Sequence, residues 1–409
     1  MIRLPFYYGW VVLAALAATE MMAMGATLYS AGLYVLPLQH EFGLSRAASS
    51  SSISILLIGT SIVAPIIGKA LDTYSVRWVL CLGALAMSAA FAVIALSSSL
   101  WLMIPMLILP AAIGFAALGT LPTGTLLSRW FRKRRGLALG LGAVATSGGG
   151  IWVAPWLSAL IQAYGWRQTL LIEAAIIGLV SIFLAVFVVR NTPADMGLEN
   201  HPENVEDGPQ KKAEVSGPQW HWKAILSDRT FWGTAILLAI VSGISQALVT
   251  SLPPYAVELG FSAAAAASLI SYFSWAAGVT KILGGLLADY TNRRLLMFCA
   301  GLIMVAAAVI LFVSSGYAAL AAAATLAGMA LGCALPSSSA LIASTFGAKS
   351  FGTIMGWVYV VLCLSATILP PLTGRIFDVT HSYNAAFIFF GMLSALGAAS
   401  TALIRRDSR

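Results

Sequence analysis

The sequence contains very little charge. Asp, Glu, Lys and Arg make up only 9% of its 409 residues, whereas 59% are hydrophobic. Soluble globular domains carry about 25% charged residues, so an ordinary soluble fold is excluded. Runs that alternate between apolar and polar residues are also missing, which argues against a membrane β-barrel.

Cysteine, histidine and catalytic motifs are scarce as well. All four cysteines fall inside apolar runs, where we expect them to pack rather than to form disulfides or hold a metal. The four histidines lie in expected loops, and the sequence shows no nucleophile motif, phosphate-binding loop or metal-ligand spacing. The sequence therefore predicts a protein that is not an enzyme and that uses no cofactor and no metal.

Long apolar segments are abundant. A membrane-spanning helix needs about 20 mostly apolar residues, and such stretches follow one another along nearly the whole chain. The first stretch is too long for a cleavable signal peptide. We predict an all-α membrane protein whose twelve transmembrane helices lie at about residues 8–33, 48–71, 77–97, 101–126, 136–162, 168–190, 231–256, 262–287, 294–314, 318–345, 352–377 and 383–404.

The formal net charge of +8 is explained by the membrane rather than by nucleic acid. With both termini in the cytoplasm, most Lys and Arg residues fall in cytoplasmic loops; Arg46, Arg167 and Arg375 lie outside, and Lys281 lies within a span. This bias is the positive-inside pattern. We expect a monomeric, multi-pass protein in the lipid bilayer of a bacterial inner (cell) membrane, with no nucleic-acid partner.

The chain repeats itself at a constant shift of 217 residues. The matched residues include Pro, Glu, Gly, Asp and Arg, mostly at helix ends, as in Pro37 with Pro254 and Glu41 with Glu258. We infer two parallel six-helix bundles, residues 1–190 and 230–409, joined by an acid-rich cytoplasmic linker over 191–229. Parallel halves of this kind can rock around a central site.

One motif occurs in both copies. Gly68 to Arg77 has the form G-x-x-x-D-x-x-x-x-R, and so has Gly285 to Arg294. The glycine permits close approach of helices, and the carboxylate can cap a helix N-terminus or pair with a cation. The pattern resembles the loop motif of the major facilitator superfamily. The resemblance implies gating residues that latch the two halves on the cytoplasmic side: Asp72, Arg77, Asp289 and Arg294.

Five shorter segments are similar to the monocarboxylate-transporter branch of that family, including its bacterial oxalate/formate antiporter relatives. They are the Y-G-W-V-V segment from Tyr8, the Y-S-A-G-L segment from Tyr29, the basic turn from Ser128 to Ala138, Gly165-Trp166-Arg167, and the segment Pro193 to Leu198. This resemblance implies transport of a small carboxylate.

Three ionisable residues lie well inside predicted spans, where charge is costly and usually functional: Glu20, Glu173 and Lys281. Lys281 lies eight residues before Asp289 on the eighth span, with Ser274, Ala277, Gly278 and Gly285 on its face. Those small residues leave room for a ligand beside the ammonium. In the resembled family this position usually holds an arginine that binds the substrate carboxylate, and the alternative for Lys281 is an ion pair or snorkelling to the interface.

Glu20 is expected to carry a proton or to act as a counter-ion of Lys281, and the alternative is a packing carboxyl. Glu173, near the outer face, is expected to bond locally. Hydroxyl and amide groups on the helices that line the path in the resembled fold are the remaining candidates for substrate binding: Tyr29, Ser30, Thr120, Gln246, Ser338 and Tyr359, with Thr123, Thr250 and Ser337 as further members.

These features predict a secondary active transporter of small organic anions, with proton-coupled symport of a lactate- or pyruvate-type monocarboxylate as the leading hypothesis. Two alternatives stay open: a proton-driven exporter of hydrophobic cations that uses Glu20, and an exchanger of dicarboxylates and monocarboxylates. Lys281 argues against the first, because it would repel a cation. A non-transporting sensor or membrane enzyme would need a catalytic constellation, which the sequence does not show.

Overall fold

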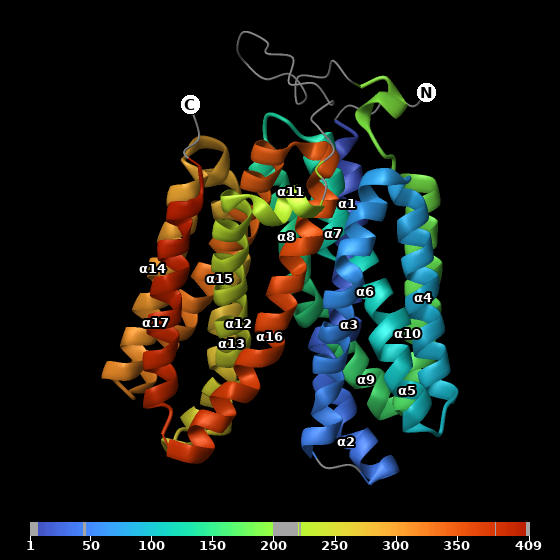
Figure 1. The fold of residues 1–409 in the computed structure, drawn as a ribbon. Helices are drawn as coiled ribbons and strands as arrows, with labels where there is room; N and C mark the ends of the chain where they lie inside the picture. Colours follow the sequence, from blue (N-terminus) through green and yellow to red (C-terminus); the bar gives the residue numbers. More distant parts are fainter. Residues whose placement is uncertain (1–6, 44–45, 199–219, 221, 381, 406–409) are drawn as a thin grey trace. The chain divides into compact units, whose positions relative to one another are not determined.

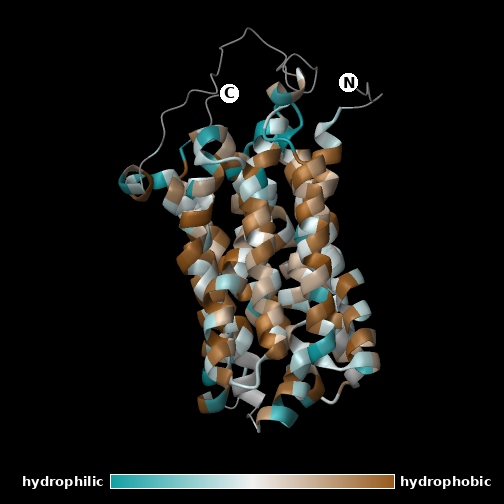
Figure 2. Ribbon diagram, turned by 90° about the vertical axis from the view of Figure 1, so that its right-hand side faces the viewer, coloured by the Kyte–Doolittle hydropathy of each residue, from teal (hydrophilic) through white to brown (hydrophobic). Residues whose placement is uncertain are grey.

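The computed structural model describes residues 7–43, 46–198, 220, 222–380 and 382–405, and every regular element in this part of the chain is a helix (Figure 1). Eleven of the described helical segments are long and apolar enough to cross a membrane. Figure 2 shows that hydrophobic residues predominate along the helices and that hydrophilic residues gather towards their ends. The protein is therefore a multi-pass membrane protein.

The twelfth helix is α13, Ala263–Tyr290, which holds Lys281 in its second half. It has 28 residues, which at ~1.5 Å per residue is more than the ~30 Å of a hydrocarbon core. With α13 counted, the helices match the predicted spans to within a few residues at most ends. The predicted all-α fold with twelve transmembrane helices is confirmed.

The chain divides into two compact units. One comprises Met1–Ala138, Gly142–Gln219 and Phe346–Val360; the other comprises Leu139–Leu141, Trp220–Thr345 and Val361–Arg409. The helices α8 and α16 therefore each contribute residues to both units. The repeat predicts two bundles, residues 1–190 and 230–409. In the observed units, by contrast, Leu139–Leu141 belongs to the second unit and Phe346–Val360 to the first. The predicted division stays a prediction.

The elements up to residue 198 are mostly long helices interrupted by wider turns. They are α1 (Gly9–Met24), η1 (Gly25–Tyr29), α2 (Ala31–Phe42), α3 (Arg46–Thr73), α4 (Val76–Leu96), α5 (Leu100–Met106), η2 (Leu107–Ala111), α6 (Ala112–Leu118), α7 (Thr120–Trp130), α8 (Arg135–Gly148), η3 (Gly149–Val153), α9 (Ala154–Tyr164), α10 (Trp166–Phe183), η4 (Leu184–Val188) and η5 (Pro193–Met196). Four of them, η1 to η4, are π-helical, a form that is frequent at functional sites.

The elements from residue 222 onward are longer and less interrupted. They are α11 (Trp222–Ser227), α12 (Arg229–Glu258), α13, α14 (Arg293–Val313), α15 (Tyr317–Phe346), η7 (Ala348–Ser350), α16 (Phe351–Thr380), α17 (Asn384–Ser400) and η8 (Thr401–Leu403). Side chains cap several N-termini. Asp228 accepts hydrogen bonds from the backbone of α12, and Asn292 does the same for α14.

Two of the family-like segments meet in an aromatic cluster. The Tyr7 hydroxyl donates to the Trp130 carbonyl, and the Tyr8 hydroxyl donates to the Val188 carbonyl at 2.7 Å. The Tyr7 ring lies 5.4 Å from that of Phe131, and Trp130 and Phe131 are fully buried. The Y-G-W and S-R-W-F segments thus join the start of α1 to the end of α7.

A third family-like segment organises the other ends of the same helices. Arg167 donates to the Glu41 carboxylate, with its Nη2 at 2.5 Å from Oε1, and to the carbonyls of Ala95 and Ser97. Trp166 Nε1 donates to Glu41 Oε2 at 2.8 Å. These hydrogen bonds lower the pKa of the half-exposed Glu41 carboxyl, because they stabilise its ionised form. The G-W-R segment therefore ties α2 to α10 and to the end of α4.

Glycines make a very close helix contact in the first unit, between α3 and α16. A Cβ atom on Gly68 of α3 would lie 2.1 Å from the Gly352 carbonyl oxygen of α16, and one on Gly356 would lie 2.5 Å from the Ala64 carbonyl oxygen. Only glycine permits two backbones to approach this closely. The predicted role of the motif glycine Gly68 in close packing is confirmed.

We therefore expect Gly68→Ala to lower the thermal stability of the purified protein, by an amount equivalent to about 1–3 kcal/mol, because α3 and α16 must move apart. Gly374→Ala on α16 is the matched control, since a Cβ there would meet no atom within 4 Å. Melting temperatures in the same detergent test this. Equal melting temperatures for the two variants would contradict the packing argument.

Candidate functional site

Glu20 and Thr120, two residues predicted for the site, lie in direct contact. The Thr120 hydroxyl donates to Glu20 Oε1 at 2.6 Å, and Glu20 is fully buried. Thr120 is the first residue of α7, directly after Gly119, whose backbone interrupts the fourth span. The carboxyl therefore lies at the N-terminal end of a helix, where the helix dipole is positive.

Lys281 is buried in α13, with only 3% of its surface exposed. Three residues earlier on α13, a Cβ on Gly278 would meet no atom within 4 Å, so the helix surface is open at that position. An ammonium buried among apolar helices is costly and is therefore a mark of function. Gly278 thus leaves open space on α13, and room for a ligand beside the Lys281 ammonium stays a prediction.

Elsewhere on the same face, two small residues lie against neighbouring helices. A Cβ on Gly140 of α8 would lie 2.4 Å from the Lys281 carbonyl oxygen and 3.1 Å from the Gly285 Cα atom. At Ala277, a Cβ on Gly332 of α15 would lie 2.6 Å from the carbonyl oxygen. Gly285 and Ala277 therefore take part in close helix packing, and the expected room for a ligand next to them stays a prediction.

Tyr29 lies at the end of a π-helical segment and stays accessible. Its side chain is 43% exposed, and its ring lies against Gly150, where an added Cβ would be 2.8 Å from Tyr29 Cδ1. Beside it, an added Cβ on Gly149 would lie 2.6 Å from the Gly25 backbone nitrogen. Gly149 and Gly150 thus allow η1 and η3 to pack closely, and Gly150 lies against the ring of Tyr29.

The other predicted polar residues are distributed over several helices. Ser30 is fully buried, and so is Ser338 of α15, whose hydroxyl donates to the carbonyl of Leu335 in its own helix at 2.8 Å. Tyr359 of α16 is 8% exposed, and Gln246 of α12 is half-buried. Their role in substrate binding stays a prediction.

Glu173 bonds locally, as expected. The Tyr34 hydroxyl of α2 donates to Glu173 Oε1 of α10 at 2.8 Å. Its second oxygen, Oε2, is buried and has no hydrogen-bond partner in the described part of the chain.

The motif carboxylate Asp72 caps α16. Its Oδ1 accepts from the backbone N–H of Gly352 at 3.0 Å, and its Oδ2 accepts from that of Thr353 at 2.6 Å. Arg129 Nη2 lies 3.4 Å from Asp72 Oδ1 and donates to the Leu71 carbonyl at 2.8 Å. Asp72 thus fulfils both roles that the motif suggested, a helix cap and an ion pair. Sequence reasoning did not single out Arg129, although it lies in the quoted S-R-W-F segment.

The other three motif residues differ in their surroundings. Arg77 donates to the carbonyls of Ala185 and Val186 at the start of η4, at 3.2 Å and 2.5 Å. The backbone N–H of Arg294 bonds to the Asn292 side chain that caps α14. No ion pair between Arg77 and Asp72 is present in the described residues, so a gating role for Arg77, Asp289 and Arg294 stays a prediction.

Twelve membrane-spanning helices, a duplicated G-x-x-x-D motif and a buried cation in an apolar helix define a polytopic membrane transport protein. A family model of the Major Facilitator Superfamily matches residues 15–271 and 249–409. The chain belongs to this superfamily and is a transporter, not an enzyme.

Sequence relatives agree with this assignment. The chain is 28% identical over 401 residues to human monocarboxylate transporter 11, covering 96% of this chain and 82% of the relative. It is 25% identical over 396 residues to monocarboxylate transporter 13 of Rattus norvegicus, covering 96% and 87%.

Two solved structures share the fold. The proton:xylose symporter XylE superposes with a TM-score of 0.75 at 16% identity, covering 98% of this chain and 96% of the other. The transporter FucP in its outward conformation gives 0.71 at 17% identity, covering 98% and 100%.

We expect Asp72→Ala to lower thermal stability by about 1 kcal/mol, because the first turn of α16 loses its cap. Asp72→Asn should have a smaller effect, since the amide oxygen can still accept one backbone hydrogen bond. The control is Asp378→Ala, which removes an exposed carboxylate from the same helix. A melting temperature for Asp72→Ala equal to that of Asp378→Ala would show that the cap contributes nothing.

Proposed function

We propose that this transporter carries a small organic anion, a monocarboxylate of the lactate or pyruvate type, together with a proton by alternating access. The observation that carries the proposal is the burial of Lys281 within an apolar helix, three residues after Gly278, where an added Cβ would meet no atom within 4 Å. The names of its relatives, monocarboxylate transporters 11 and 13, support the same substrate class. An ammonium is a point charge with three N–H donors, which suits one carboxylate group.

The number of buried charges favours a monocarboxylate over a dicarboxylate. Among the described Asp, Glu, Lys and Arg residues, four are buried as whole residues, namely Glu20, Glu173, Asp228 and Lys281, so Lys281 is the one cation in this set. A dicarboxylate would bring a second negative charge without a second buried base to receive it. A hydrophobic cation would be repelled by Lys281, which argues against an exporter of cations.

Glu20 is the proposed proton carrier. Thr120 fixes one carboxyl oxygen by a hydrogen bond of 2.6 Å, so the group is held in one orientation at the break in the fourth span. A carboxyl that is positioned in this way can bind and release a proton without moving far. Lys281 and Glu20 then divide the task, the first binding the anion and the second binding the proton.

Asp72 is the proposed latch of the transport cycle. Its bonds to the first turn of α16 hold that helix close to α3, and rocking of one repeat against the other would break them. In this arrangement we place residues 1–190 and 230–409 as the two halves, both termini in the cytoplasm, and the monomer in the lipid bilayer of a bacterial inner membrane.

Replacement of Lys281 tests the anion site. In proteoliposomes we expect Lys281→Ala to reduce uptake of radiolabelled lactate and pyruvate by at least about tenfold, because the carboxylate loses its charged partner. Lys281→Arg should retain measurable uptake, since it keeps the positive charge. Oxalate and tetraphenylphosphonium should compete poorly in the wild type.

Lys223→Ala, which removes an exposed lysine from α11, controls for charge alone. Unchanged melting temperatures would show that the variants fold. Full lactate uptake by Lys281→Ala would remove Lys281 from the site.

Replacement of Glu20 separates proton coupling from binding. Glu20→Gln keeps an oxygen that can accept the Thr120 hydrogen bond but cannot release a proton at physiological pH. We expect it to abolish accumulation of lactate driven by an inward proton gradient and to leave exchange of lactate against preloaded lactate within about twofold of the wild type. Accumulation by Glu20→Gln that still follows the gradient would refute the assignment.

A further inference from the structure

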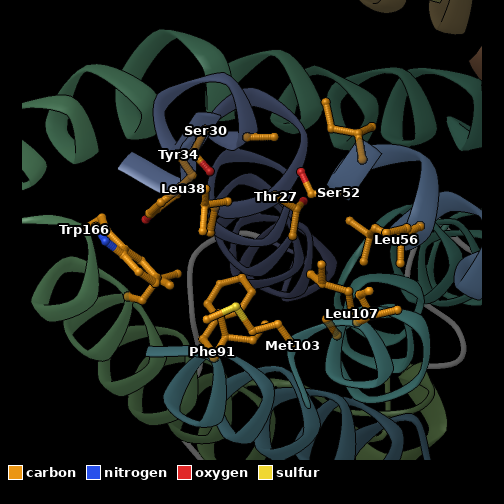
Figure 3. Close-up of a pocket in the computed structure, with 18 of the residues that line it drawn as sticks. Thr27, Ser30, Tyr34, Leu38, Ser52, Leu56, Phe91, Met103, Leu107 and Trp166 are labelled. Atoms are coloured by element: carbon orange, nitrogen blue, oxygen red, sulfur yellow. The ribbon is translucent and has the colours of Figure 1, made fainter. Parts of the chain in front are cut away.

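A cavity lies inside the first unit, away from Glu20 and Asp72. Its volume is about 260 Å³. Segments of η1, α2, α3, α4, α5, η2 and α10 line it, and no Asp, Glu, Lys or Arg is among the lining residues. Figure 3 shows Thr27, Ser30 and Ser52 on one side of the cavity and Phe91 and Met103 on the opposite side.

Ser30 gives this apolar cavity an unused polar group. The residue is fully buried, and its Oγ has no hydrogen-bond partner in the described part of the chain. A buried hydroxyl without a partner is unfavourable and is rare in folded proteins. Ser30 lines the cavity, and rotation of its side chain about the Cα–Cβ bond would turn Oγ towards a molecule inside the cavity, which could then supply the missing partner.

Three other polar groups at the cavity already donate their hydrogens within the protein. The Thr27 hydroxyl donates to the Ala23 carbonyl at 2.6 Å, and the Tyr34 hydroxyl donates to Glu173 at 2.8 Å. Trp166 Nε1 donates to Glu41 at 2.8 Å. The hydroxyl oxygens of Thr27 and Tyr34 therefore offer lone pairs, and Ser30 can either donate or accept. Such a lining favours a ligand that donates a hydrogen bond.

We propose that this cavity is a second binding site, for a small neutral molecule with an apolar body and one hydroxyl group, of the phenol class. An apolar cavity of about 150 Å³ is known to hold benzene, so about 260 Å³ admits a substituted phenol. A carboxylate does not fit, because no cation lines the cavity to replace its hydration. The site is thus distinct from the proposed anion site at Lys281 and does not depend on it.

Quenching of Trp fluorescence by 4-bromophenol tests the proposal, because the bromine atom quenches a nearby indole and Trp166 lines the cavity. We expect saturable quenching on top of a linear component from partition into detergent. The saturable part should disappear in Trp166→Phe while saturable heat of binding in calorimetry persists. Bromobenzene, which lacks the donor, should bind about fivefold to tenfold more weakly, and 4-bromobenzoate should give no saturable quenching that Trp166→Phe removes.

Ser30→Ala identifies the hydrogen bond. It should weaken 4-bromophenol binding about fivefold to tenfold and leave bromobenzene binding unchanged. Ser181→Ala is the matched control, because Ser181 is equally buried, its Oγ also lacks a partner in the described residues, and it does not line the cavity. Equal affinities of Ser30→Ala and Ser181→Ala for 4-bromophenol, or saturable quenching that survives Trp166→Phe, would overturn the proposal.

Discussion

The close approach of helix backbones at glycine is the constraint on which this structure depends. Gly68 lets α3 lie directly against Gly352 at the start of α16, and this approach brings Asp72 within hydrogen-bond distance of two backbone N–H groups of α16. The same device recurs where Gly140 of α8 lies against the backbone of Lys281. In a lipid bilayer, where apolar surfaces gain little by leaving the lipid, such tight packing supplies much of the association between helices.

Polar groups are few in this chain, and most of those described have a structural task. Tyr7, Tyr8 and Trp130 join the ends of helices, and Arg167 holds Glu41 and two carbonyls at the other ends. Several of the segments that resemble the monocarboxylate-transporter branch therefore serve to hold helix ends together. Lys281 stands apart from them, because scaffold packing alone does not call for an ammonium within an apolar helix.

Glu20 and Ser30 are ten residues apart on the first span, yet the structure gives them different surroundings. The carboxyl of Glu20 meets Thr120 at the break of the fourth span, whereas Ser30 follows the π-helical turn η1 and faces the apolar cavity. A π-helical turn shifts the residues that follow it relative to a regular helix. One span can thereby serve two sites of opposite character.

The sequence by itself determined the twelve helices, the duplicated motif and the three ionisable residues inside the spans, because apolar runs and the charges within them are properties of composition and order. The tertiary structure decided which faces meet. Asp72 contacts Arg129 and the first turn of α16, and Thr120 donates a hydrogen bond to Glu20. On α13, Gly285 lies against Gly140 of α8, whereas Gly278 has open space. These outcomes could not be predicted because a span that is apolar on every side does not indicate which face turns inward. Only contacts between residues far apart in the chain settle that orientation.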